Sequence, residues 1–137
     1  MPAAVVQVCV DPRLNHELLR IQVRQKLHGL HLSADRIFIV NDVAGNVGAS
    51  FQNTVDFLVG RRDPIVLSAV LHHDDCLAAQ DGLRTPLADS AEEMRKYLLL
   101  HDIRGPVLTG TILTEHTLVQ WSDEPPQRYV PHMFFAR

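Results

Sequence analysis

The sequence predicts an α/β protein whose mainly parallel sheet of about four to five strands is flanked by helices. Short apolar runs rich in Val and Ile alternate along the chain with longer stretches of helical periodicity. Gly and Pro residues separate the two kinds of segment. Clusters of His, Cys and Asp follow two of the apolar runs, and parallel sheets form their sites at such strand ends. The alternation and these clusters together favour the α/β class.

Length and composition limit the classes of protein that this chain could be. Its 137 residues, 46% of them hydrophobic, suit a single domain over residues 1–137 with one packed core. The net charge of -3 and the lack of a basic stripe argue against nucleic acid as a partner. No apolar run reaches the roughly 20 residues of a membrane helix, and the first residues do not resemble a signal peptide. We therefore expect a cytoplasmic protein that has no membrane partner.

The first half of the chain is expected to hold two strands and two helices. Residues 3–10 (AAVVQVCV) are almost all apolar, which is typical of a buried parallel strand. Leu19, Val23 and Leu27 recur at helical spacing, so they predict a helix over residues 14–27 that stops near Gly29. The elements expected next are a strand at 36–41, a glycine-bearing turn at 44–48 and a helix at 49–60 closed by Gly60.

The second half is expected to complete the sheet. Ser90 and Glu93 have the spacing of a capping box, which predicts a helix over residues 90–101. The proline-bearing tail at 123–137, which includes Phe134 and Phe135, is expected to be extended and to pack on a partner. The strands expected here are 64–71, 105–114 and 117–121, with a hairpin tip at 115–116 between the last two.

Two short motifs carry the chemistry of this sequence. The first strand ends in C-x-D-x-R, with Cys9, Asp11 and Arg13, and the third ends in H-x-x-C, with His73 and Cys76. Zinc prefers thiolate and imidazole donors in a tetrahedral arrangement. If the two strands are neighbours, both motifs face one crevice. The sequence therefore predicts that Cys9, His73 and Cys76 bind Zn²⁺, while Arg13 orients Asp11 at or beside the fourth position.

The two motifs, in this order, resemble those of the β-class carbonic anhydrases. The likeness extends over most of the chain, because FIVNDVAGN (38–46), ASFQNTVDFLV (49–59), PIVLSAVLHHDDC (64–76) and VLTGTILTEHTLVQW (107–121) resemble the family's segments in the same order. The resemblance implies that Cys9, His73 and Cys76 hold zinc and that Asp11 and Arg13 form the catalytic dyad. It further implies reversible hydration of CO2 to bicarbonate by a zinc-bound hydroxide, in a homodimer or a multiple of dimers.

The sequence also departs from the family pattern. The family's glycines on each side of H-x-x-C are replaced by His72 and Leu77, and its helical N-terminal extension has no counterpart before the first expected strand. Two alternatives therefore stay open beside CO2 hydration. One is a related zinc hydrolase that acts on CS2 or COS, since a reshaped pocket could suit these similar small molecules. The other is a catalytically silent zinc-binding module that works in assembly.

Ordinary structural roles also stay open for the motif residues. Cys9 could be an inert buried thiol, Asp11 could cap the following helix, and Arg13 could be a surface residue. We expect His72 to be an exposed or hydrogen-bonded loop residue. Asp74 and Asp75 are expected to stabilise the turn or to cap the element that follows, without contacting the metal.

Overall fold

The computed structural model describes residues 1–125, which form a five-stranded sheet in the order β2-β1-β3-β4-β5. All neighbouring strands are parallel except β5, which runs antiparallel to β4. The predicted fold class is confirmed. The tail with Phe134 and Phe135 lies outside the described residues. The strands are β1 (Ala3–Cys9), β2 (Arg36–Asp42), β3 (Ile65–His73), β4 (Val107–Leu113) and β5 (Leu118–Trp121).

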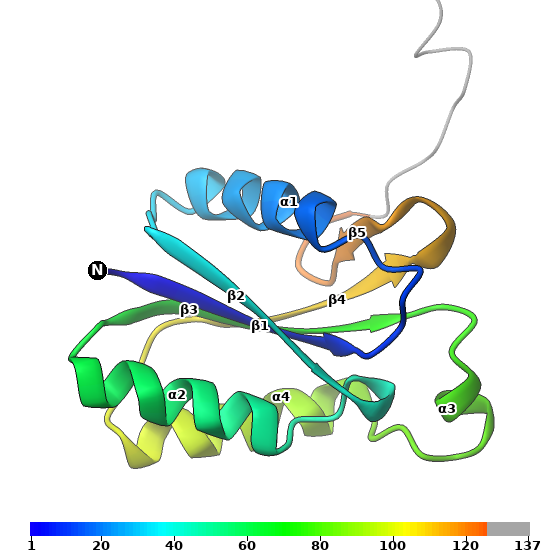
Figure 1. Ribbon diagram of the computed structural model, residues 1–137. Coiled ribbons are helices and arrows are strands. Elements are labelled where there is room, and N and C mark those ends of the chain that lie inside the picture. Colours follow the sequence, from blue (N-terminus) through cyan, green and yellow to red (C-terminus); the bar gives the residue numbers. More distant parts are fainter. Residues whose placement is uncertain (126–137) are drawn as a thin grey trace, which may run out of the picture.

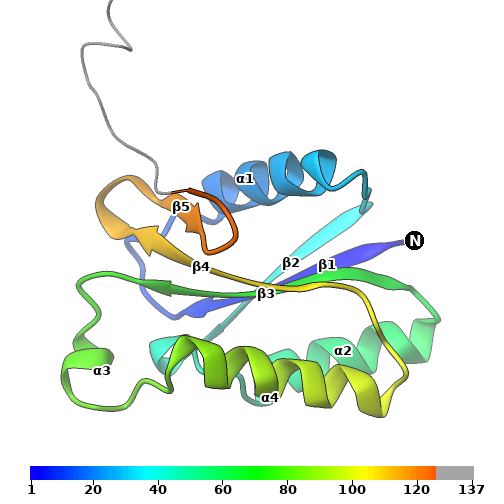
Figure 2. The same ribbon diagram turned by 180° about the vertical axis from the view of Figure 1, so that it is seen from behind.

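Helices cover both faces of this sheet, as Figures 1 and 2 show. Helix α1 lies on one face, while α2 and α4 lie on the other. None of the helices within residues 1–125 has the length and apolar character needed to span a bilayer. The α-helices are α1 (His16–Gly29), α2 (Ala49–Arg61), α3 (Leu77–Gln80) and α4 (Leu87–Leu100), and the 3₁₀ turns are η1 (Val43–Gly45) and η2 (Thr114–His116).

Two apolar layers hold the sheet between its helices. Every residue of β1 is buried, because one side of the strand faces α1 and the other faces α2 and α4. Val6 and Leu19 belong to the first layer, and Val5 and Phe51 belong to the second. This double burial explains why the strand reads as a continuous apolar run rather than as an alternating one.

Local capping fixes where α1 begins. The side chain of Asn15 accepts a hydrogen bond from the backbone N–H of Leu18 at 3.1 Å, so Asn15 is the N-cap and the helix begins at His16 rather than at Leu14. Leu14, just before the cap, is buried in the same core cluster as Leu19. The predicted stop at Gly29 is confirmed.

Other predicted helix boundaries are also wrong. Helix α4 begins at Leu87 after Pro86, so Ser90 lies inside the helix, fully buried, and does not form a capping box with Glu93. Pro86 is the N-cap, where its missing N–H removes no helical hydrogen bond, and this helix start precedes the serine. Helix α2 continues past Gly60 to Arg61 and ends where Arg62 takes a left-handed conformation, with φ at +61°.

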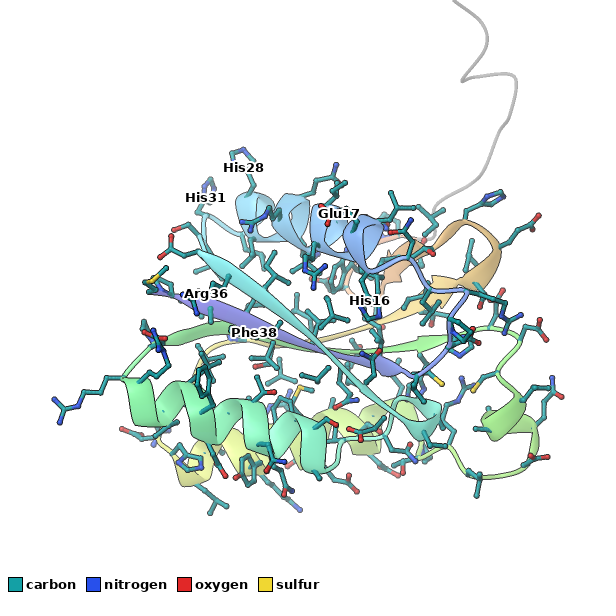
Figure 3. The ribbon with its side chains drawn as sticks, in the orientation of Figure 1. His16, Glu17, His28, His31, Arg36 and Phe38 are labelled. Atoms are coloured by element: carbon teal, nitrogen blue, oxygen red, sulfur yellow. The ribbon has the colours of Figure 1, made fainter. Side chains whose placement is uncertain are left out.

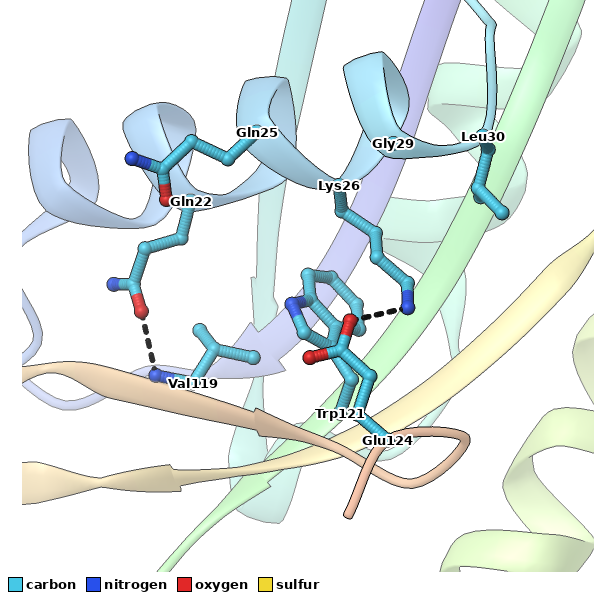
Figure 4. Close-up of a pocket in the computed structure, with 8 residues that line it drawn as sticks. All are labelled: Gln22, Gln25, Lys26, Gly29, Leu30, Val119, Trp121 and Glu124. Atoms are coloured by element: carbon cyan, nitrogen blue, oxygen red, sulfur yellow. Dashed lines mark hydrogen bonds and ion pairs between the residues drawn. The ribbon is translucent and has the colours of Figure 1, made fainter. Parts of the chain in front are cut away.

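The β5 edge of the sheet is fastened to α1 by polar side chains (Figure 4). Gln22 accepts from the N–H of Val119 at 2.7 Å and donates to the carbonyl of Thr117 at 2.6 Å. The ammonium group of Lys26 binds the carboxylates of Asp123 and Glu124. Side chains therefore bond to this strand edge as a further strand would. A cavity of about 260 Å³ lies between α1 and the edge.

Candidate metal centre

The two sequence motifs meet at the C-terminal edge of the sheet. Strands β1 and β3 are parallel neighbours, so Cys9 and His73, the last residue of each, lie at the same edge. Cys76 follows three residues later. One donor atom from each of the three residues lies within 4.8 Å of the other two, and the sulfur atoms are 3.9 Å apart. All three side chains are buried, and the group could hold a metal ion.

The backbone around these residues is tightly turned. Asp75 adopts a left-handed conformation with φ at +53°, which reverses the chain between the end of β3 and Cys76 at the N-cap of α3. Gly45 of η1, with φ at +71°, packs against β1, and a Cβ there would lie 3.3 Å from the backbone nitrogen of Cys9. Glycine therefore suits position 45 for two reasons: the backbone is left-handed there, and it packs closely against the backbone of Cys9.

A hydrogen-bond chain orients the imidazole of His73. The Thr114 hydroxyl donates to the carbonyl of Asp74 at 2.7 Å, so this hydroxyl accepts from His73 Nδ1, 2.9 Å away. The neutral ring therefore carries its proton on Nδ1 and presents a free lone pair at Nε2. Nε2 is buried and has no hydrogen-bond partner within residues 1–125. A buried acceptor without a partner is costly, and a metal ion would satisfy it.

The chemistry of the donors also fits a metal ion. Burial raises the pKa of the Cys9 thiol, and the nearby Cys76 raises it further. Two buried thiols this close cannot both ionise without a compensating positive charge, and a divalent cation would provide one. Two sulfurs and one imidazole nitrogen form a donor set that zinc favours.

Asp11 and Arg13 lie beside this group. Arg13 Nη2 and Nε donate to the two carboxylate oxygens of Asp11 at 2.8 and 3.1 Å. These hydrogen bonds from Arg13 lower the pKa of Asp11 to about 2, so its carboxylate is charged at neutral pH. Asp11 Oδ2 lies 3.7 Å from His73 Nε2. The pair predicted from the sequence is therefore formed, and the carboxylate borders the space where the three donors converge.

A cavity of about 560 Å³ opens over the donor group. The loop after β1, the turn η1 and the loop after β3 form its walls. Val10, Val43 and Leu77 line it, although each of these side chains is more than half exposed. Leu77 is one of the two residues in place of the family's flanking glycines, and it adds apolar surface to this mouth.

The structure contradicts the expectation for His72. Strand β3 continues through His73, so His72 is a buried strand residue and not a loop residue. Its Nε2 has no hydrogen-bond partner among the described residues. Burial, helped by the charge of Arg84 and by His73, lowers the pKa of His72 to about 4, so the ring is neutral at neutral pH.

The other predicted polar residues lie as follows. Asp74 connects the turn after β3 to the start of η2, since its carboxylate accepts from the N–H of Thr114 at 2.7 Å. Asp75 contacts Arg13, a partner that the sequence did not indicate. Figure 3 shows His28 and His31 near the C-terminal end of α1, at the opposite end of the sheet from the donor group. These two histidines take no part in the site.

Two residues of the site were missed in the sequence. Thr114 orients His73, and Arg84 donates to the carbonyl of His73 at 3.0 Å. Thr114 directly follows β4, the neighbour of β3. Its place at a strand end was the signal that could have identified it.

Comparison with known proteins supports the fold through structure alone. No family model matches the sequence, and no curated protein matches it. A carbonic anhydrase from Streptococcus mutans is 16% identical with a TM-score of 0.52, over 88% of this chain and 81% of that chain. A carbon disulfide hydrolase is 12% identical with a TM-score of 0.50, over 89% and 79% of the two chains. A tetrameric β-carbonic anhydrase from Sordaria macrospora is 10% identical with a TM-score of 0.50, over 89% and 81%. The chain therefore has the β-carbonic anhydrase fold.

Proposed function

We propose that this protein is a zinc-dependent, carbonic anhydrase-like lyase that reversibly hydrates CO2 to bicarbonate. The observation that carries the proposal is the buried Nε2 of His73, which has no hydrogen-bond partner within the described residues 1–125. It lies close to the sulfurs of Cys9 and Cys76 at the edge of a β-carbonic anhydrase fold. These three residues would hold the metal. Zinc bound there supplies a water molecule acidified enough to react near neutral pH.

The residues of this chain perform the other steps. Thr114 keeps the proton of His73 on Nδ1, which leaves Nε2 free for the metal. Asp11, held ionised by Arg13, would accept a hydrogen bond from the attacking oxygen at Oδ2 without taking its proton, and so would orient that oxygen toward the carbon of CO2. Val10, Val43 and Leu77 line the entrance with apolar surface, which suits a neutral substrate without hydrogen-bond donors.

A second substrate class is favoured by the same entrance. CS2 and COS have the linear shape of CO2, and the exposed apolar side chains at the cavity mouth would suit these sulfur-containing molecules. The similarity to a carbon disulfide hydrolase concerns the fold. Release of hydrogen sulfide from either compound, with poor CO2 hydration, would assign this alternative. Bound zinc with no turnover of any of the three would indicate a silent assembly module.

The test combines metal content with stopped-flow CO2 hydration. His73→Ala should lose both the zinc and the activity, because it removes one of three ligands. His28→Ala, which removes an exposed histidine remote from the site, should lose neither. CO2 hydration that survives the loss of zinc would contradict the proposal.

We further propose that the protein is a homodimer, or a multiple of dimers, in the cytoplasm. The free thiols of Cys9 and Cys76 suit a reducing compartment. The β-carbonic anhydrase from Sordaria macrospora that shares this fold is tetrameric, which supports assembly of this chain. Sedimentation velocity should report a species of at least twice the chain mass of 15.4 kDa. A monodisperse monomer would contradict the assembly proposal without affecting the zinc site.

A further inference from the structure

We propose that Asp75 is a positioning residue that anchors Arg13 and thereby keeps Asp11 from becoming a fourth metal ligand. The inference rests on the proposed function, since it concerns the same metal site. Asp75, which is not one of the three metal donors, would then control how easily an external ligand reaches the metal. The site is open when Asp11 pairs with Arg13, and it is closed when Asp11 binds the metal.

The guanidinium of Arg13 is shared between two aspartates. Its Nε and Nη2 donate to the carboxylate of Asp11. Its Nη1 donates to Asp75 Oδ2 at 2.9 Å, and Nη2 also donates to the backbone carbonyl of Asp75 at 2.9 Å. Both edges of the planar group are therefore occupied, which fixes its position and its plane.

Asp75 connects this guanidinium to the loop that carries the metal donors. It lies between His73 and Cys76, and its left-handed backbone aims its side chain and its carbonyl at the same cation. Arg13 itself follows the strand that ends in Cys9. The anchor thus ties the loop after β1 to the loop after β3, directly beside the donor group.

The contact between Arg13 and Asp75 matters because Asp11 lies close to the metal donors. Asp11 Oδ2 is 3.7 Å from His73 Nε2, so a carboxylate released by Arg13 and turned toward the three donors could become a further ligand of a metal held there. The hydrogen bonds from Arg13 oppose that rotation. If Arg13 loses its hold on Asp75, its guanidinium gains freedom to move with Asp11 or away from it. The population of closed sites would then rise, and Asp11 would compete with external ligands for the metal.

The exposure of the pair makes this role separable from folding. The side chains of Arg13 and Asp75 are 48% and 67% exposed, so their ion pair contributes little to stability. Glycine tolerates the left-handed conformation at position 75 better than aspartate does. Asp75→Gly therefore removes the carboxylate without straining the backbone, and Asp75→Asn keeps the shape while it removes the charge.

The experiment measures azide binding to the cobalt-substituted protein by its visible absorption spectrum. Azide requires an open position on the metal, so its Kd reports the closed population and not turnover. Asp75→Gly should raise the azide Kd by about threefold or more, and Asp75→Asn by less. Asp102→Gly should not change it. Asp102 is a matched control, because it is also exposed, left-handed and paired with an arginine, Arg104.

Repeating Asp75→Gly in a variant that also carries Asp11→Asn tests whether Asp75 acts through Asp11 or has only a general structural role. In Asp11→Asn, the residue that closes the site is weakened as a ligand, so adding Asp75→Gly should leave the azide Kd within a factor of about 1.5. An equal rise in both backgrounds, or no rise in either, would overturn the inference while leaving the zinc proposal intact. Failure of the unmutated protein to bind cobalt or zinc would overturn both.

Discussion

Arg13 and Lys26, both in the described part of the chain, each bind two carboxylates, but their surroundings differ. Arg13 binds Asp11 and Asp75 at the C-terminal edge of the sheet, and its side chain is 48% exposed. Lys26 binds Asp123 and Glu124 at the β5 edge, and its side chain is only 8% exposed. The same charge arrangement therefore occurs once in solvent beside the candidate site and once beneath the surface beside Trp121.

Because of this difference, the Arg13 cluster serves to orient Asp11, whereas the Lys26 cluster serves to stabilise the fold. Water and salt screen the ion pairs of Arg13, so they contribute little to stability, and their value lies in directing the Asp11 carboxylate. Lys26 has given up most of its hydration, so its partners are required to compensate the buried charge. The planar fork of arginine suits orientation of two carboxylates, whereas the ammonium of lysine acts as a point charge that fastens α1 to the end of β5.

The titration of Lys26 reflects the same balance. Burial lowers its pKa, but the hydrogen bonds to Glu124 and Asp123 together outweigh that effect and leave the pKa above its ordinary value. The folded protein therefore favours the charged form of this lysine. By linkage, the charged lysine stabilises the fold.

The largest predicted effect tests the Arg13 cluster through activity. Arg13→Lys cannot bind both oxygens of Asp11 while also holding Asp75, so kcat/KM for CO2 hydration should fall by about tenfold or more. The free energy of unfolding should change by less than about 1 kcal/mol. Stopped-flow hydration and urea unfolding measure the two quantities.

Arg95→Lys is the matched control, since Arg95 is equally exposed and is paired with Glu92 on α4. It should change neither quantity measurably. If Arg13→Lys lowered stability and left turnover intact, the division between the two clusters would be wrong.

The next effect tests the Lys26 cluster through stability. Lys26→Met keeps the length of the side chain but leaves Asp123 and Glu124 without their cation. We expect the free energy of unfolding to fall by about 1–2 kcal/mol, less than for a fully buried pair because the two carboxylates are partly exposed. Urea unfolding measures the change. Metal content and CO2 hydration should stay the same, and a loss of either would show that the two regions are coupled.

The smallest predicted effect is the pH dependence of the stability that Lys26 contributes. Because its pKa is raised on folding, its stabilisation is fully present below the unfolded pKa of about 10.4 and is lost as pH rises through the folded pKa. The stability difference between the unmutated protein and Lys26→Met should thus be constant from about pH 7 to pH 9 and shrink above about pH 10. Urea titrations at each pH measure it. A difference that grows with pH would contradict the assigned direction.

Most of the fold was readable from the sequence because β1 and β3 are buried on both faces. Such strands are continuous apolar runs, which periodicity detects easily. The predicted start of α4 was wrong, because the spacing of a capping box can also occur inside a helix, as it does at Ser90. The helix begins directly after Pro86. Local signals compete at helix ends, and tertiary packing selects among them.

The candidate site was readable only in part. Cys9, His73 and Cys76 could be grouped from the rule that parallel strands end at one edge, and the structure brings their donor atoms together. The hydrogen bonds of Thr114 and Asp75 depend on strand order and loop conformation, which no spacing in the sequence encodes. The burial of His72 was missed because the end of β3 could not be distinguished from the start of a loop.

The metal content of the purified protein, measured without added metal, tests the central claim most directly. We expect about one zinc per chain in the unmutated protein. His73→Ala should lose this zinc, and His28→Ala should retain it. A protein that contains no zinc and takes up none on reconstitution would contradict this claim, and would show that the β-carbonic anhydrase fold is present here without the chemistry.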